Sequence, residues 1–261
     1  MGATARASRS RSAPPTPKFS AAPARGDRRP TTSQVPDPAA FIRAHTAPAS
    51  AALVPELTLH LASEITPLWQ ASEDWLAARN VAPPFWAFAW PGGQALARHV
   101  LDHPALVAGR RVLDFAAGGG IAALACARAG AAAVEASDID PLARAAIALN
   151  AATNRIAVTV AADVVQATCR WDLILCGDVC YEAPMTAHIL PWLRAMARAA
   201  EVIVADPGRA YLPTAGMAGF ARYAVPTTRE LEDRETREVT LYRLAPPEAT
   251  VVGTGPSLQP V

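Results

Sequence analysis

Apolar positions between residues 92 and 205 follow two spacings in turn, one typical of short buried strands and one typical of helices. Apolar runs predict strands over residues 111–115, 134–138, 157–160, 172–176 and 202–205. Between them, Ala-rich stretches with helical spacing predict helices over residues 92–101, 121–129, 141–151 and 187–199. Strands that alternate with helices predict an α/β fold, a doubly wound and mostly parallel sheet covered on both faces.

The pattern changes on both sides of this region. Before it, a short helix is predicted over 41–45, a strand over 57–61 and a helix over 69–79. After it, residues 211–223 have loose helical spacing, and residues 239–244 alternate as a strand does. Two closing strands in a row predict an antiparallel hairpin at the edge of a seven-stranded sheet.

The same pattern divides the chain into four regions. Residues 1–34 are rich in Arg, Ser, Pro and Ala and predict a disordered basic tail. Residues 35–90 form an N-terminal extension, and residues 91–245 form the α/β domain. Residues 246–261 contain prolines and predict a flexible C-terminal tail.

Charge and cysteine usage exclude several classes of protein. The net charge is +1, but the first 34 residues hold seven basic residues and one acid, so the remainder is near −5 and offers no general nucleic-acid footprint. The four cysteines form no C-x-x-C pair and the histidines are scattered, which argues against a metal site. Cysteines in apolar runs suit a reducing compartment, and no apolar stretch is long enough to cross a membrane.

A glycine-rich turn follows the first strand of the alternating region. It contains Gly118 and Gly120, and the next strand ends at Asp138, about 20 residues beyond the glycines. This βαβ layout holds a cofactor that contains a nucleoside. Asp114, at the end of the first strand, would repel the pyrophosphate of a dinucleotide but would suit the sulfonium and α-amino group of S-adenosylmethionine.

The spacing Asp114-x-Ala116-x-Gly118-x-Gly120 resembles the first motif of class I methyltransferases, with Ala116 where that family usually has Gly. The resemblance implies that Asp138 accepts hydrogen bonds from the ribose hydroxyls. It also places Asp163 near the adenine amino group, although a plain loop acid is an equal alternative. Asp140, ahead of Pro141, is expected to cap a helix.

Five motifs in order extend the resemblance over residues 35–244. The chain resembles the electron transfer flavoprotein β-subunit lysine methyltransferases, within the seven-β-strand lysine methyltransferases. The resemblance implies that residues 91–245 are the S-adenosylmethionine-dependent methyltransferase domain and that residues 35–90 cap its substrate side. The motifs that carry this resemblance are Pro84 to Leu96, Asp114 to Gly120, Asp138-Ile139-Asp140-Pro141, Gly177 to Tyr181 and Asp206-Pro207-Gly208-Arg209.

The resemblance assigns candidate catalytic residues. The D-x-x-Y signature falls on Asp178 and Tyr181, after a predicted strand, where active sites of open α/β sheets lie. Asp178 would orient the lysine amine and help it lose a proton, and Tyr181 would line its channel; the competing interpretations are a helix cap and a packing aromatic. Trp90 is implied as a cofactor contact and Trp86 as packing or pocket rim. Arg209 either meets an acidic partner or forms an ion pair in its own loop.

The sequence therefore predicts a monomeric, cytoplasmic S-adenosylmethionine-dependent protein-lysine methyltransferase. The resemblance implies the β subunit of electron transfer flavoprotein as its protein substrate, with no nucleic acid, membrane or metal involved. The same scaffold would also suit a different acceptor: a ribosomal protein, a protein N-terminus or a nicotinamide-like small amine. Three further hypotheses compete with this one: a non-catalytic S-adenosylmethionine-binding scaffold, a nucleic-acid methyltransferase that uses the basic tail, and a dinucleotide-dependent dehydrogenase.

Overall fold

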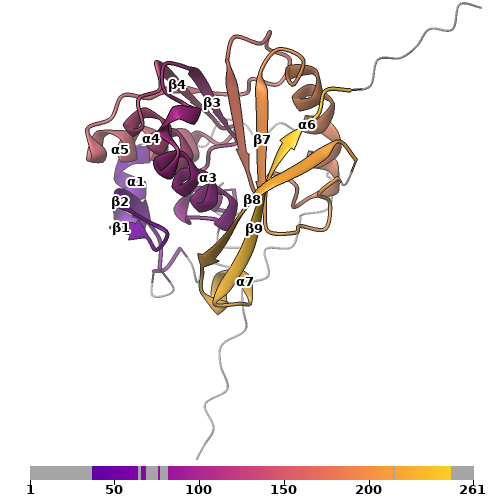
Figure 1. Ribbon diagram of the computed structural model, residues 1–261. Coiled ribbons are helices and arrows are strands. Elements are labelled where there is room, and N and C mark those ends of the chain that lie inside the picture. Colours follow the sequence, from indigo (N-terminus) through magenta and orange to yellow (C-terminus); the bar gives the residue numbers. More distant parts are fainter. Residues whose placement is uncertain (1–36, 64–65, 69–75, 77–81, 214, 248–261) are drawn as a thin grey trace, which may run out of the picture.

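A seven-stranded sheet forms the centre of the molecule (Figure 1). The structure is a computed structural model that describes residues 37–63, 66–68, 76, 82–213 and 215–247. The strand order is β5-β4-β3-β6-β7-β9-β8. The strands are β3 (Arg111–Phe115), β4 (Ala133–Ser137), β5 (Thr159–Ala161), β6 (Leu173–Gly177), β7 (Glu201–Asp206), β8 (Met217–Pro226) and β9 (Thr236–Leu244).

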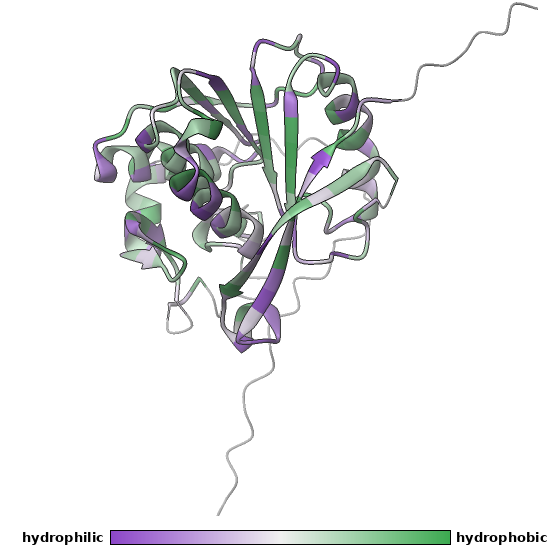
Figure 2. Ribbon diagram, in the orientation of Figure 1, coloured by the Kyte–Doolittle hydropathy of each residue, from purple (hydrophilic) through white to green (hydrophobic). Residues whose placement is uncertain are grey.

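The first five of these strands are parallel, and each predicted strand of the alternating region is present. Parallel central strands are buried on both faces, and β6 and β7 are accordingly apolar along most of their length (Figure 2). Successive side chains of β6 point to opposite faces, so Leu173 and Leu175 join one core and Ile174 and Cys176 the other.

Helices cover both faces of the sheet, as the alternating pattern predicts. The core on one face is completed by α3 (Pro91–Asp102) and α4 (Ile121–Arg128), and α5 (Pro141–Asn154) lies beside them; the core on the other face is completed by α6 (Ala183–Met196) (Figure 1). Short helical turns connect these elements. The helices and turns are α1 (Pro38–His45), η1 (Phe85–Ala87), α3 (Pro91–Asp102), η2 (Pro104–Leu106), α4 (Ile121–Arg128), α5 (Pro141–Asn154), α6 (Ala183–Met196) and α7 (Arg229–Glu232).

The edge hairpin is confirmed, but the helix predicted over residues 211–223 is wrong. Residues Met217–Pro226 form β8, which pairs antiparallel with β9, and β9 pairs antiparallel with β7. The register shifts between Gly219 and Ala221, as a β-bulge does. A bulge interrupts the two-residue period, and several small residues in this strand imitate a helical composition.

A second antiparallel pair, β1 (Ala47–Ala51) and β2 (Val54–Leu61), packs against α5. The backbone of β2 binds two asparagine side chains of α5. Thr58 N donates to Asn154 Oδ1 at 3.0 Å, and His60 N donates to Asn150 Oδ1 at 2.8 Å. Asn150 is fully buried and also donates to the carbonyl of Gly119, which ties the hairpin to the glycine-rich turn.

Some predictions fall outside the described residues. These are the tail over 1–34, the tail from residue 248 onward and, apart from Leu76, the helix over 69–79. None of the helices in the described part of the chain has the length and apolarity that a membrane span requires.

Candidate active site

A cavity of about 690 Å³ lies outside the carboxyl ends of β3, β4 and β6. Residues that follow each of these strands line it, among them Ala116, Asp138 and Asp178. Open α/β sheets bind ligands at this edge, and the volume lies in the range of small-molecule sites. The cavity therefore gathers motifs that are far apart in the sequence.

The glycine-rich turn forms one wall of the cavity. Ala116, Gly118 and Gly120 all have positive φ angles, of 53°, 53° and 79°. Gly118 lies on the wall, and its N–H donates to Asp138 Oδ2 at 2.9 Å. Gly120 is not among the lining residues; a Cβ there would lie 3.2 Å from Ile147 Cγ1, so this glycine permits close packing of the turn against α5.

Three predicted carboxylates stand on the cavity wall beside β4 and β5. Asp138 accepts hydrogen bonds from the amides of Gly118 and Asp140, both at 2.9 Å, and burial raises its pKa. Asp140 caps α5 through Leu142 N, as expected, and burial raises the pKa of Asp140 to about 6. Asp163 accepts from Val165 N at 2.9 Å and also faces the cavity.

Asp114 occupies a different position from the other carboxylates. It is 3% exposed, and its Oδ2 accepts a hydrogen bond from Ala123 N, at the start of α4, at 2.8 Å. It lines a smaller hollow of about 50 Å³, shared with Trp90, Gly118 and Asp178, rather than the main cavity. Burial raises the pKa of Asp114 to about 7.

Aromatic rings also line the cavity. Trp90 donates its indole N–H to the carbonyl of Phe85 at 2.8 Å, and the rings of Phe85 and Tyr181 lie 5.5 Å apart. Tyr181 is 37% exposed at the cavity, and burial raises its pKa to about 12, so its hydroxyl stays protonated at neutral pH. Trp86, by contrast, is 1% exposed and belongs mainly to the core.

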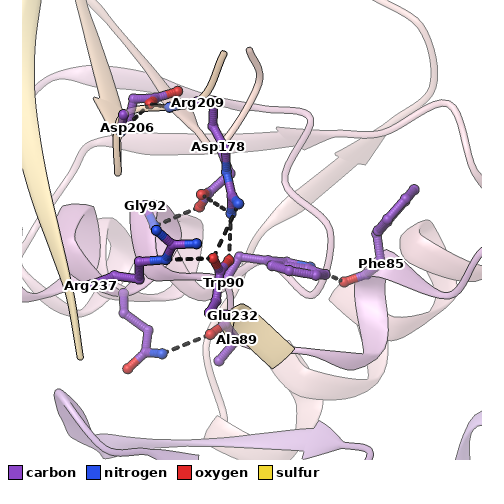
Figure 3. Close-up of polar contacts among 11 residues, drawn as sticks. Phe85, Ala89, Trp90, Gly92, Asp178, Asp206, Arg209, Glu232 and Arg237 are labelled. Atoms are coloured by element: carbon purple, nitrogen blue, oxygen red, sulfur yellow. Dashed lines mark hydrogen bonds and ion pairs between the residues drawn. The ribbon is translucent and has the colours of Figure 1, made fainter. Parts of the chain in front are cut away.

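Asp178 stands at the end of β6 with a left-handed backbone, at φ 55°. Its Oδ2 accepts from Gly92 N, in the first turn of α3, at 2.5 Å, so it caps α3 rather than the α6 helix that follows it (Figure 3). Its Oδ1 pairs with Arg209 Nη2 at 3.0 Å. Burial raises the pKa of Asp178 to about 6, while Arg209 and the Gly92 amide act in the opposite direction.

Arg209 forms ion pairs within its own chain, which decides between the two roles that the sequence allows for it. Besides Asp178, it binds Glu232 of α7 with two nitrogens, at 2.5 and 3.2 Å, and Arg237 of β9 binds the same carboxylate at 2.9 Å (Figure 3). The loop is shaped by Asp206, whose Oδ1 accepts from the amides of Gly208 and Arg209.

Sequence reasoning missed Glu232 and Arg237. Both lie in or beside a charged stretch after residue 228, and nothing in that stretch indicates contact with Asp178. Only the pairing of β9 between β7 and β8 brings them close. Within the described ranges, no group of three or more His, Cys, Asp or Glu side chains is arranged to hold a metal ion.

Comparison with known proteins finds similarity to methyltransferases. Residues 96–180 match the family model for PrmA, the ribosomal protein L11 methyltransferase. A solved structure of magnesium protoporphyrin IX methyltransferase from Synechocystis PCC 6803, with bound SAM, aligns with a TM-score of 0.43 and 20% identity over 60% of this chain and 86% of that chain.

Curated relatives are more similar still. The electron transfer flavoprotein beta subunit lysine methyltransferase of Xenopus laevis is 35% identical over 219 residues, covering 80% of this chain and 87% of the relative. Its namesake from Danio rerio is 37% identical over 166 residues, covering 62% and 63%. The protein is thus an S-adenosylmethionine-dependent methyltransferase with a doubly wound sheet. Within that class, it belongs to the family of electron transfer flavoprotein β-subunit lysine methyltransferases.

Proposed function

We propose that this protein methylates lysine side chains of the β subunit of electron transfer flavoprotein, with S-adenosylmethionine as methyl donor. The observation that carries the proposal is the 35% identity to a relative of that name over 87% of its length. Because the match covers so much of that relative, it extends beyond the sheet to the segments around the cavity. The arrangement of the cavity supports the same reaction.

The charges on the cavity wall fit a positively charged donor. Most of the ionisable groups there are acidic, and a pyrophosphate would meet repulsion from them. Bound at this edge, S-adenosylmethionine would supply a methyl group activated by a positively charged sulfur. The acidic residues are Asp138, Asp140, Asp163, Asp178 and Glu182, beside Arg209 and His188.

Individual residues fit parts of that donor. Asp138, with both oxygens fixed by amides, keeps free lone pairs for ribose hydroxyls, and Asp163 stands where an amino group of adenine would be recognised. Gly118 leaves room for close approach of the ligand. Trp90 and Asp114 border the smaller hollow, which suits the amino-acid end of the donor, and Gly120 contributes by shaping the turn.

Asp178 and Tyr181 are proposed to handle the lysine. An amine attacks only through its free lone pair, and the ordinary lysine pKa of about 10.4 leaves it protonated at neutral pH. The aromatic rings of Phe85, Trp90 and Tyr181 would displace water from the bound amine, and this desolvation disfavours the charged ammonium. Asp178 would accept a hydrogen bond from the arriving amine and so direct its lone pair into the cavity.

The test is methylation of purified electron transfer flavoprotein, with lysine sites read by mass spectrometry. Asp178→Asn keeps the shape of the side chain but removes its charge, and we expect it to lower kcat roughly 100-fold. The affinity for S-adenosylhomocysteine, measured by titration calorimetry, should change little. Tyr181→Phe is the matched aromatic variant. Wild-type binding of the donor without any mass shift on the flavoprotein would reject this substrate.

The match to the L11 methyltransferase family favours a second candidate, methylation of a ribosomal protein. That match ends at residue 180 and omits the segments from α6 onward. It therefore covers most of the residues proposed to hold the donor, from Asp114 to Asp163, and leaves Trp90, Tyr181 and Arg209 outside the match. Labelling a ribosome-containing lysate with tritiated donor distinguishes the two acceptors, and labelling of neither would favour the non-catalytic scaffold.

A monomeric state and a cytoplasmic location stay predictions from the sequence, as do the absence of nucleic-acid partners and the limits of the four regions. Light scattering on the purified protein checks the first of these. Deletion of residues 1–34 tests whether the basic tail is needed for activity. Activity on the flavoprotein that survives this deletion would exclude the nucleic-acid hypothesis, in which the basic tail holds the substrate.

A further inference from the structure

Arg209 is the centre of a chain of charges that joins the candidate catalytic carboxylate to the edge hairpin. One nitrogen, Nη2, contacts both Asp178 Oδ1 and Glu232 Oε1, and Nη1 contacts the second oxygen of Glu232 (Figure 3). The guanidinium also lies 5.9 Å from the centre of the Trp90 ring. A planar guanidinium held by two nitrogens on one carboxylate has a fixed direction, which a lysine would not have.

The side-chain burial of Glu232, Asp178 and Arg209 indicates that Glu232 is the fixed member of this chain of charges. The side chain of Glu232 is 1% exposed, that of Asp178 is 9% exposed, and that of Arg209 is 20% exposed because it lies on the cavity wall. Arg237 Nε also binds Glu232, at Oε2, the oxygen that Arg209 Nη1 contacts. Glu232 is therefore an anchored clamp, and Arg209 is the member of the chain that faces both the clamp and the cavity.

We propose, resting on the function proposed above, that Arg209 is a positioning residue for methyl transfer. Its guanidinium, clamped by Glu232, holds the Asp178 carboxylate ionised and in place, and offsets the charge of that carboxylate toward the arriving lysine. The positive charges of Arg209 and Arg237 balance the negative charges of two carboxylates, Asp178 and Glu232. A protonated lysine consequently gains little net attraction, whereas a neutral amine still finds a hydrogen-bond acceptor.

The other groups around Asp178 do not replace this role. Glu232 opposes ionisation of Asp178, Asp206 binds the amides of its own loop, and Cys180 carries a neutral thiol, since burial raises its pKa to about 12. The Gly92 amide accepts no proton and donates a single hydrogen bond. Arg209 is the cation that contacts Asp178 among the described residues, and Arg237 reaches it only through Glu232.

The first test is the pH dependence of kcat on the flavoprotein. With Arg209→Met, loss of a cation at this distance should raise the pKa of Asp178 by roughly 1–3 units. Starting from a pKa of about 6, that rise should make the ratio of wild-type to variant kcat about 2 to about 90 at pH 7, and the ratio should fall steadily toward 1 near pH 9.5. Arg209→Lys should restore much of the rate. Because the substrate amine titrates in the same way with both enzymes, its effect cancels in the ratio of kcat values. The pH dependence of the ratio therefore reports the titration of Asp178.

Two controls separate this effect from a general loss of ion pairs. Arg110→Gln breaks a pair with Glu201 at the opposite end of the strands and should leave the ratio near 1 at every pH. Arg237→Gln loosens the clamp without touching Asp178 and should give a smaller pH-dependent change than Arg209→Met. A ratio that is large but constant with pH would overturn the proposal and leave Arg209 with a structural role.

The second test needs no protein substrate. In protein saturated with S-adenosylhomocysteine, ¹³C-carboxyl NMR follows the titration of Asp178, with its signal assigned by Asp178→Asn. We expect a higher midpoint in Arg209→Met than in wild type, with Arg209→Lys between them. Equal midpoints would overturn the positioning role even if the wild type methylates the flavoprotein. A shifted midpoint without methylation of that protein would reject the substrate and leave the role of Arg209 standing.

Discussion

The φ angle of Ala116 explains why class I methyltransferases usually have glycine at this position. Ala116 has a φ of 53°, in the left-handed region, where an L-residue costs about 1–2 kcal/mol. Ala116→Gly is therefore expected to raise the free energy of unfolding by about 0.5–1 kcal/mol, after the greater unfolded-state entropy of glycine is subtracted. Urea denaturation measures this change. Arg155→Gly is the matched control, because Arg155 is exposed, lies away from the cavity and has a φ of 57°. This substitution should stabilise the protein by a similar amount.

If Ala116→Gly lowers the stability while Arg155→Gly raises it, packing of the Ala116 methyl group outweighs the strain. The same residue shows what the sequence could and could not predict here. The D-x-A-x-G-x-G spacing identified the turn, and the departure at Ala116 was visible. The strain that it carries became measurable only from the backbone angle.

Asp114 makes the stability of the ligand-free protein depend on pH. Burial raises its pKa to about 7, whereas the unfolded chain releases this proton near the ordinary value of 3.8. Between these values the folded state binds more protons, so the free energy of unfolding falls as pH rises from about 4 to about 7. In Asp114→Asn the free energy of unfolding should fall less steeply with pH. The difference should be most visible between pH 6 and pH 7, because Asp140 and Asp178, whose pKa values are about 6, contribute to the slope mainly below this range.

Thermal unfolding of the ligand-free protein across pH 5–8 checks this expectation. The control is Asp172→Asn, because Arg111 holds the pKa of that exposed carboxyl well below its usual range. The Asp172 contribution is complete above pH 5, so its variant should keep the wild-type slope. A decline that is equally steep in Asp114→Asn would show that Asp114 is already ionised in the fold.

At the scale of elements, the start of α3 and the end of β6 are in direct contact through glycines. A Cβ on Gly92 would lie 2.5 Å from Asp178 Oδ2 and 2.7 Å from the carbonyl of Ala205, whereas a Cβ on Gly93 would lie 3.1 Å from a methyl group of Ile121. Gly92→Ala should therefore destabilise the protein by about 1–3 kcal/mol and displace Asp178.

Gly93→Ala is the matched control for this contact, one position further along the same helix. Its crowding is against a movable methyl group, and alanine favours the helix by up to about 1 kcal/mol, so its stability should stay close to wild type. Activity should follow the same order, with Gly92→Ala far below Gly93→Ala. Equal activity in the two variants would mean that the position of Asp178 tolerates movement of α3.

The elements that the sequence predicted well are those whose burial leaves a periodic mark. Strands β6 and β7 are apolar along most of their length because both of their faces are covered, and β3 is apolar except at Arg111 and Asp114. Strand β8 was mistaken for a helix, since a bulge shifts its alternation and it is the last strand of the sheet, with one hydrogen-bonded neighbour. The sequences of β7 and β8 contain no pattern that predicts the position of β9 between them.

The candidate site divides in the same way. Asp138 and Asp178 directly follow strands and Tyr181 lies three residues after Asp178, so a local pattern is enough to predict that they share one edge of the sheet. Glu232 reaches this edge only because the hairpin of β8 and β9 folds back along β7. Contacts of that kind depend on topology, and a single sequence has no local signal for them.

At the scale of the whole molecule, the distribution of charge decides which ligand stabilises the fold. The carboxylates of the cavity come from separate connections after β4, β5 and β6, so they meet only in the folded chain. A cationic ligand lowers their mutual repulsion, and a ligand that binds only the folded state stabilises it by mass action. S-adenosylmethionine at 100 times its Kd should thus raise the free energy of unfolding by about 2.7 kcal/mol.

NAD, whose pyrophosphate would face the same carboxylates, should leave the unfolding temperature unchanged at equal concentration, as measured by scanning calorimetry. The sulfonium adds a second, sharper expectation, because S-adenosylhomocysteine has the same shape without the positive charge. Burial raises the pKa values of Asp140 and Asp178 to about 6, so the wall gains negative charge as pH rises through that value. The preference for S-adenosylmethionine over S-adenosylhomocysteine should accordingly grow between pH 5 and pH 8, and a preference that stays flat would place the sulfonium away from these carboxylates.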